Sequence, residues 1–282
     1  MDIVSEMKYS VLMSVYYKEK AEYLRQAMQS MWDQTIPTDD FVLVCDGPLT
    51  VELDAVIEDM QKKYAETLHV VRLQQNSGLG NALNEGLKYC IYEYVARMDS
   101  DDISKPERCE KELEVFVNNP ELSIVGSVIE EFETTPGDLK KLRVVPETNE
   151  EIREFAKKRN PFNHPSVMFK KSAVLSVGGY IELRFFEDYY LWIRLIVNDL
   201  KGYNLLNSLV YMRLSLDSSR RRGGINYIQS PIILYNYMVE NNYISQFENL
   251  NNVFIRFISS ILPNRLRYKL IYGLLRKKNK VV

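Results

Sequence analysis

Three aspartates within one short stretch are the side chains of this chain best suited to chemistry. Asp99, Asp101 and Asp102 follow an apolar, β-prone run that starts at Tyr94. Carboxylates this close together repel one another unless a positive charge lies among them. Oxygen ligands without a neighbouring His or Cys suit a hard cation such as Mg²⁺ or Mn²⁺. Such a cation at a strand end commonly holds a diphosphate, so the stretch indicates an enzyme with an activated, phosphate-bearing substrate.

The elements that must position these aspartates alternate between strand and helix along the N-terminal third of the chain. Short apolar runs predict strands at 10–15, 41–44, 68–73 and 94–98. Apolar side chains with helical spacing lie between them, at 20–32, 53–64 and 80–90. This alternation predicts an α/β fold with a mostly parallel sheet and helices on both faces. Ligands of such sheets bind beyond the carboxyl ends of the strands, where Asp46 also lies.

After residue 105 the alternation loosens. The pattern predicts helices at 106–118, 150–158 and 186–197, and strands at 123–132, 166–169 and 205–212. A polar stretch with consecutive arginines beside two glycines, 215–224, predicts a loop, and we expect only helices from about 225 onward. The chain is therefore predicted to have two parts. The first is a substrate-binding and catalytic α/β domain over 1–224, and the second is a C-terminal helical extension over 225–282.

The composition excludes several classes of protein. The chain has 282 residues, of which 46% are hydrophobic and 26% charged, as in ordinary globular proteins. The three cysteines are scattered without CxxC spacing, which favours a reducing compartment such as the cytoplasm over a disulfide framework. Two histidines are too few for a histidine-based zinc site. We see neither a signal-peptide pattern nor an apolar run long enough to span a bilayer.

Five sequence blocks together resemble the family 2 glycosyltransferases. The blocks are the opening strand 10–16, Cys45-Asp46-Gly47, the N-x-G-x-x-x-A-x-N-x-G block 76–86, the D-x-D-D block 99–102 and the E-D-x-x-x-W block 187–192. Each block alone is weak evidence for the resemblance, but the five blocks in this order over residues 8–225 are strong evidence together. Cys45 departs from the family, which often has a first aspartate there. Within the family, the chain looks most like bacterial surface-polysaccharide transferases.

The resemblance implies the GT-A fold and a donor site for a nucleotide-sugar, most often a UDP-sugar. It places Asp46, Asn76, Gly78 and Asp99 against the nucleotide, and Asp101, with Asp99, on Mg²⁺ or Mn²⁺. Asp102 would support the metal or the acceptor side. The residues also allow plainer readings: an acidic turn that caps the next helix, an ordinary Asp-Gly turn and a glycine loop that opens a helix.

The resemblance also implies an inverting transfer with Asp188 as the catalytic base and Glu187 as its neighbour that holds the acceptor. Trp192, one turn later, would pack beneath the acceptor site, and His164 would line it. Arg220 and Arg221, in a run that continues to Arg222, would close over the diphosphate, because guanidinium groups suit phosphates. Acids that favour a helix N-terminus, a structural histidine and a solvated loop are the alternatives.

The C-terminal tail carries its own pattern. From 253 to 282 there are eight Lys or Arg residues and no Asp or Glu, interleaved with apolar side chains, although the whole chain has a net charge of −2. This suits amphipathic helices that lie peripherally on an anionic membrane, on its inner face, and it would fit a lipid-linked oligosaccharide as the acceptor. Packing of the tail against the domain is the alternative. One basic tail is too narrow a surface to indicate nucleic-acid binding.

Two rival functions remain open at this point. A sugar-phosphate nucleotidyltransferase has a similar fold, but it would need a glycine-rich basic loop after the first strand, where this chain has no glycine between Ser14 and Glu19. A non-catalytic relative could scaffold a membrane assembly through its tail. The presence of Asp188 and of the aspartate cluster speaks against this second rival.

Overall fold

The computed structural model describes residues 3–214, 228–261 and 277–278. The predicted alternation is present: β1 Tyr9–Val15, α1 Ala21–Trp32, β2 Asp40–Cys45, α2 Val51–Lys63, β3 Leu68–Arg72, α3 Leu79–Tyr89 and β4 Tyr94–Asp99. A short 3-10 helix, Ile3–Glu6, precedes β1. The strands β3, β2, β1 and β4 are adjacent in that order and parallel, so their carboxyl ends meet at one edge of the sheet.

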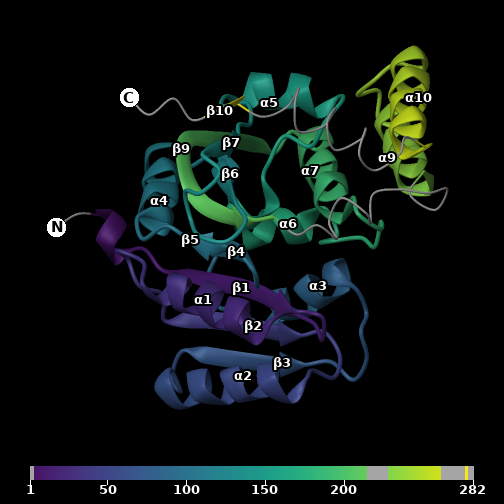
Figure 1. Cartoon of the computed structure of the whole chain (residues 1–282). Coiled ribbons are helices and arrows are strands. Elements are labelled where there is room, and N and C mark those ends of the chain that lie inside the picture. Colours follow the sequence, from purple (N-terminus) through teal and green to yellow (C-terminus); the bar gives the residue numbers. More distant parts are fainter. Residues whose placement is uncertain (1–2, 215–227, 262–276, 279–282) are drawn as a thin grey trace.

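The parallel strands are buried on both faces, because each face carries its own core. Val11 and Met13 of β1 point into a cluster with α1 and α2, whereas Leu12 points into a second cluster with α3. Side chains alternate across a strand, so consecutive apolar residues are needed to fill both cores. All six residues of β2 are buried for this reason. Figure 1 shows these helices around the N-terminal half of the sheet.

The rest of the sheet is mixed. It contains β5 Ile103–Ser104, β6 Leu122–Phe132, β7 Lys141–Arg143, β8 Met168–Lys170 and β9 Lys201–Arg213. β8 lies antiparallel between β4 and β6, while β9 pairs in parallel with β6 and antiparallel with β5. The helices of this half are α4 Arg108–Asn118, α5 Asn149–Ala156, α6 Lys171–Ser176 and α7 Glu187–Val197, with a short 3-10 helix at His164–Ser166. The α/β fold is therefore confirmed, with the parallel order confined to β1–β4 and the β6–β9 pair.

Two helices, α9 Gln229–Glu240 and α10 Gln246–Ile261, follow in the C-terminal part and stand beside α7 (Figure 1). Leu234, Tyr235 and Met238 of α9 belong to the same buried cluster as Trp192 of α7. In the part of the chain that the structure describes, no helix is both long and apolar enough to cross a membrane.

The expectation of helices alone beyond residue 225 is wrong. Lys277 and Lys278 form a short strand, β10, that pairs antiparallel with Leu142 and Lys141 of β7. An edge strand leaves backbone groups unpaired, and a passing extended segment can satisfy them whatever its side chains are. The chain therefore returns to the sheet near its C-terminus. A domain boundary at residue 224 stays a prediction.

Candidate active site

Asp46, directly after β2, holds the loop that opens α3. Its carboxylate accepts hydrogen bonds from the backbone nitrogens of Ser77, at 2.7 Å, and of Gly78, at 3.1 Å. The Asn76 side-chain amide in turn donates to the Asp46 carbonyl oxygen at 3.2 Å. The two segments approach so closely that a side chain on Gly47, whose φ is +87°, would meet the Asn76 nitrogen at 2.6 Å. Asp46, Asn76 and Gly78 thus form one rigid loop pair at the carboxyl edge of the sheet.

The acidic turn after β4 begins with an ion pair inside the protein. Both oxygens of Asp99 accept hydrogen bonds from the guanidinium of Arg97, one of them at 2.7 Å. Arg97 is 1% exposed, while the Asp99 side chain is 33% exposed and faces the sheet edge. A planar guanidinium that meets a carboxylate through two bonds fixes its orientation. Arg97, on the same strand, therefore fixes the orientation of the Asp99 carboxylate.

Negative charge accumulates in the rest of the turn. Burial, and then the charges of Asp99 and Glu19, raise the pKa of Asp101 to about 7. Burial, and then the charges of Asp101 and Asp99, raise the pKa of Asp102 well above its ordinary value. A hard cation would relieve this repulsion, and the available ligands are oxygens only. The residues therefore fit a divalent cation.

The described residues contain no preformed group of three or more His, Cys, Asp or Glu side chains that could hold a metal. This agrees with the way Mg²⁺ is usually held, through one or two carboxylates together with substrate phosphates and water. Asp101 and Asp99 are the two carboxylates of this turn that could act in this way, because Asp102 is only 2% exposed and points inward.

Arg213, the last residue of β9, holds the acidic turn in place through Asp101 and Asp102. Its backbone nitrogen donates to the Asp102 carboxylate at 2.8 Å, and its Nε donates to the Asp101 carbonyl oxygen at 3.0 Å. The guanidinium also stacks on the ring of Tyr23, at 3.8 Å from the ring centre. The turn is thus held by the strand that leads into residues 215–227.

Glu187 and Asp188 open α7 and point to different neighbours. Asp188 accepts a hydrogen bond from the Asn160 side-chain amide at 2.6 Å and one from the Tyr189 nitrogen at 2.7 Å. Glu187 accepts from the Phe185 nitrogen at 3.1 Å and lies beside Gly80 at the start of α3. Burial is the largest cause that raises the pKa of both carboxyls, that of Glu187 to about 7.

The charge of Arg97 acts on both the acidic turn and Asp188. Burial lowers its pKa, but the charges of Asp99, Tyr180 and Asp188 together raise it above the ordinary value. Tyr180 is within 3.0 Å of His164, measured from its hydroxyl to Nε2. Burial, and then the positive charge of Arg97, lower the pKa of His164 well below its usual range. A neutral histidine, a tyrosine and an arginine thus join the two acidic segments into one cluster.

Trp192 and Asp102, both assigned to the acceptor side, are buried. Trp192 is 0% exposed and packs edge-on against Phe162 and His164, so it supports the cluster as a core residue. Asp102 is 2% exposed and accepts a hydrogen bond from the Arg213 backbone nitrogen, which ties the turn to β9. His164 is partly exposed and stays a candidate for acceptor contact. Arg220 and Arg221 lie outside the described residues.

Sequence reasoning missed Arg97, Asn160 and Arg213. One signal was present for Arg97: an arginine inside an otherwise apolar strand must have a charged partner. Asn160 and Arg213 carry no such signal, because each meets its partner across a long stretch of sequence, Asn160 to Asp188 and Arg213 to Asp102.

Known proteins resemble this chain over most of its length. Residues 10–183 match the family model described as Glycosyl transferase family 2. An uncharacterized glycosyltransferase of Haemophilus influenzae is 42% identical over 271 residues, which cover 96% of this chain and 100% of that protein. The UDP-Gal:α-D-GlcNAc-diphosphoundecaprenol β-1,3-galactosyltransferase of Escherichia coli is 39% identical over 260 residues, 92% of this chain and 94% of that one.

A solved structure shows the same fold at low sequence similarity. The mannosyltransferase of Pyrobaculum calidifontis, solved with GDP-Man and Mn²⁺, superimposes with a TM-score of 0.63 at 14% identity. The match covers 96% of this chain and 81% of that one. At this identity the likeness concerns the fold alone.

Proposed function

The chain belongs to glycosyl transferase family 2, and from that premise we propose that it transfers a sugar from a UDP-sugar to a lipid-linked glycan during synthesis of a bacterial surface polysaccharide. The observation that supports this proposal is the pair of acidic segments at the site: the turn whose Asp99 is paired with Arg97, and Asp188, which is held by Asn160 and the Tyr189 nitrogen. The E. coli relative, whose name gives a UDP-Gal donor and a diphosphoundecaprenol acceptor, supports the donor and acceptor classes. The enzyme would work on the cytoplasmic side, at the membrane surface.

Asp188 is the proposed base. It takes the proton from the acceptor hydroxyl as that oxygen attacks the anomeric carbon, on the face opposite the departing diphosphate, which inverts the configuration. The Asn160 amide holds one carboxylate oxygen and the Tyr189 nitrogen the other, so the side chain cannot rotate away. Glu187, which points toward the start of α3, would hold acceptor hydroxyls.

Asp101 and Asp99 would hold Mg²⁺ or Mn²⁺ at the turn. When bound, the cation neutralises negative charge that develops on the departing diphosphate. Asp46 and the loop at Asn76 and Gly78 would line the nucleoside, since they form the neighbouring wall of the same sheet edge. Arg220 and Arg221 stay candidates for the diphosphate contact.

The first test is a donor screen by thermal stabilisation, with and without Mn²⁺. A matching nucleotide-sugar at about 100 times its Kd should stabilise the folded chain by about 2.7 kcal/mol. For a chain of this size that raises Tm by about 5–10 °C. Asp101→Asn should lose the Mn²⁺-dependent part of the shift, whereas Asp199→Asn, at a side chain that is 89% exposed, should keep it.

The same screen can refute the proposal. If no nucleotide-sugar stabilises the wild-type chain with either cation, the assignment as a transferase that uses such donors is wrong. Turnover of a sugar phosphate with a nucleoside triphosphate would instead indicate the nucleotidyltransferase.

A pH profile tests the base. Asp188 must be ionised to accept a proton, and burial raises its pKa, although the Tyr189 nitrogen, the Asn160 amide and the charges of Arg143 and Arg97 oppose that shift. We therefore expect kcat/KM to fall on acidification with a midpoint above the ordinary aspartate value of about 3.9. The measurement is the initial rate against pH at saturating cation. A flat profile down to about pH 4 would contradict the role of Asp188.

A further inference from the structure

Helix α10 turns its polar side inward and its apolar side outward. Asn249 and Asn252 are 7% and 5% exposed, and their amides donate to Asn236 of α9 and to the carbonyl oxygen of Lys157. The outward side carries what we name the α10 apolar face: Phe247, Leu250, Phe254, Phe257 and Ile258, between 40% and 80% exposed. Phe247, Leu250, Phe254 and Phe257 follow one another at three or four residues, and Ile258 is four residues after Phe254, so all five lie on one stripe of the helix.

This arrangement is the reverse of an ordinary surface helix. Apolar side chains normally form the stripe that faces the core, because their burial stabilises the fold. Exposed large hydrophobic residues are common singly, but a contiguous patch marks an interaction site. Within the described residues such side chains concentrate on α9 and α10, where Ile232, Ile233 and Ile255 are also exposed. The α10 apolar face therefore requires a partner.

The charges beside this face indicate the kind of partner. Lys157, Lys158 and Arg159 follow α5, and the backbone of this basic run contacts α10, while the Lys157 side chain pairs with Glu154 at 2.6 Å. The Asn252 amide donates to the Lys157 carbonyl at 2.8 Å, and the Arg256 guanidinium donates to that of Lys158 at 3.4 Å. Glu248 is the one acidic residue of α10, and it caps the helix start through Ser245. The sequence that follows adds further basic residues and no acid.

We propose that the α10 apolar face docks on an anionic lipid bilayer, with the basic run 157–159 at its rim. This inference rests on the proposed function, because a lipid-linked acceptor would be held in that bilayer. An amphipathic helix buries its apolar side at the boundary between headgroups and acyl chains, and neighbouring Lys and Arg residues attract anionic lipids. A two-fold pairing of this face with a second copy would bring two basic runs together, which disfavours that alternative.

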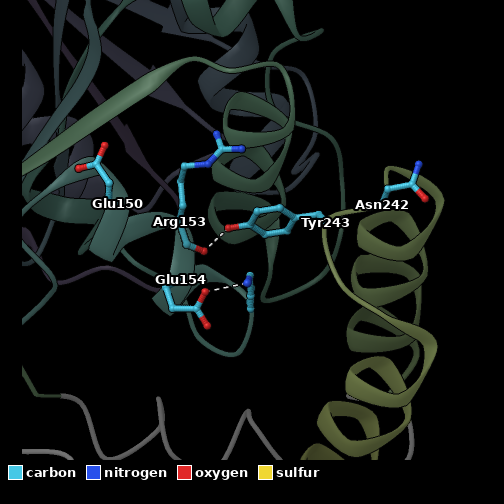
Figure 2. Close-up of a pocket in the computed structure, with 6 residues that line it drawn as sticks. Glu150, Arg153, Glu154, Asn242 and Tyr243 are labelled. Carbon is cyan, nitrogen blue, oxygen red and sulfur yellow. Dashed lines mark hydrogen bonds and ion pairs between the residues drawn. The ribbon is translucent and has the colours of Figure 1, made fainter.

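The docking face is joined to the proposed base by the same segment. Asn160, directly after the basic run, donates to Asp188 at 2.6 Å. On the other side, the Tyr235 hydroxyl donates to the Lys158 carbonyl at 3.1 Å, and the Tyr243 hydroxyl donates to the Arg153 carbonyl. Figure 2 shows Tyr243, from the turn between α9 and α10, pointing at Arg153 of α5. Both residues line an open pocket, whose volume is roughly 390 Å³. A bilayer that holds α10 would therefore also hold the segment that orients Asp188.

The test is sedimentation of the full chain with phosphatidylcholine vesicles that contain phosphatidylglycerol. The wild-type chain should bind, and rising salt should weaken the binding. Leu250→Glu with Phe254→Glu should reduce affinity by at least about tenfold. A control with the same two new charges, Val51→Glu with Leu206→Glu, changes positions that are 82% and 55% exposed and should bind as the wild type does.

A charge variant separates the electrostatic contribution to vesicle binding from the apolar one. Lys158→Glu should weaken binding to the anionic vesicles by about fivefold or more and leave the weak binding to pure phosphatidylcholine unchanged. If the α10 double variant binds as tightly as the wild type, the assignment of the surface is wrong. If the wild-type chain does not bind vesicles but forms a dimer that the α10 variant dissociates, the partner is a second copy and the proposal is overturned.

Transfer assays distinguish failure of this inference from failure of the proposed function. The α10 double variant should transfer sugar to a water-soluble short-chain acceptor at the wild-type rate, and lose rate only on acceptor embedded in vesicles. Equal rates of the variant and the wild type on the embedded acceptor would overturn the docking surface alone. Vesicle binding without transfer to either acceptor would instead overturn the proposed function.

Discussion

Asp188→Asn is expected to lower kcat by about 10²–10⁴-fold, the usual contribution of a positioned general base. The amide is nearly the same size, but it cannot take the acceptor proton. Donor affinity should stay within about twofold, because the proposed donor contacts belong to the loops after β2, β3 and β4 rather than to α7. The measurement combines single-turnover rates with donor binding in the presence of Mn²⁺.

Stability distinguishes a chemical role from a structural one. The asparagine still accepts a bond from either Asn160 or the Tyr189 nitrogen, but no longer from both. The loss of one such bond costs about 1 kcal/mol, and removal of a buried charge offsets part of it. Glu154→Gln, which replaces a carboxylate on α5 that is 68% exposed, is the control. Wild-type kcat in Asp188→Asn would refute the role of Asp188 as base and favour a scaffold.

The sequence predicts the parallel half of the fold because each of its elements satisfies a local rule. The strands β1, β2 and β4 are apolar runs with a turn or an acid at the carboxyl end, and the helices between them have apolar residues at helical spacing. The acidic turn could be recognised for the same reason, since Asp99 to Asp102 is one contiguous stretch. Partners within a few residues of one another leave a pattern that a single sequence displays.

The parts that sequence analysis missed depend on distant pairings. Lys277 and Lys278 pair with β7 through backbone groups, which leave no mark on residue type. Asn160 meets Asp188 and Arg213 meets Asp102 across 28 and 111 residues of sequence, so no local pattern marks either pair.

The orientation of α10 could also not be predicted from a single sequence. An amphipathic pattern reveals two faces but not which of them meets the protein. The inward amides of Asn249 and Asn252 decide it, and their partners belong to α9 and to the end of α5. The helix with this pattern, α10, begins at Gln246, before the basic stretch 253–282.

Arg97→Met is expected to lower the free energy of unfolding by about 3 kcal/mol and to abolish measurable transfer. Methionine fills a similar volume but leaves Asp99 without its partner, and the loss of one member of a buried ion pair costs about 3–5 kcal/mol. The lower figure applies because the Asp99 side chain is 33% exposed. Arg25→Met is the matched control, since Arg25 and Asp59 form an arginine–aspartate pair at 47% and 56% exposure, where solvent screens the attraction and the pair adds little to stability. Chemical denaturation of both variants gives the comparison.

A double-mutant cycle with Asp99→Asn separates the two effects of Arg97. The double variant removes the uncompensated carboxylate, so it should recover about half or more of the stability lost in Arg97→Met. Transfer should not recover, because Arg97 also sets the electrostatic environment shared by Asp99 and Asp188, and the proposed donor contact of Asp99 is absent. Recovery of stability without activity would make Arg97 a positioning residue for both acidic segments. If the stability losses of the two single variants simply add, Arg97 and Asp99 do not act as a pair, and the link between the acidic turn and Asp188 must lie elsewhere.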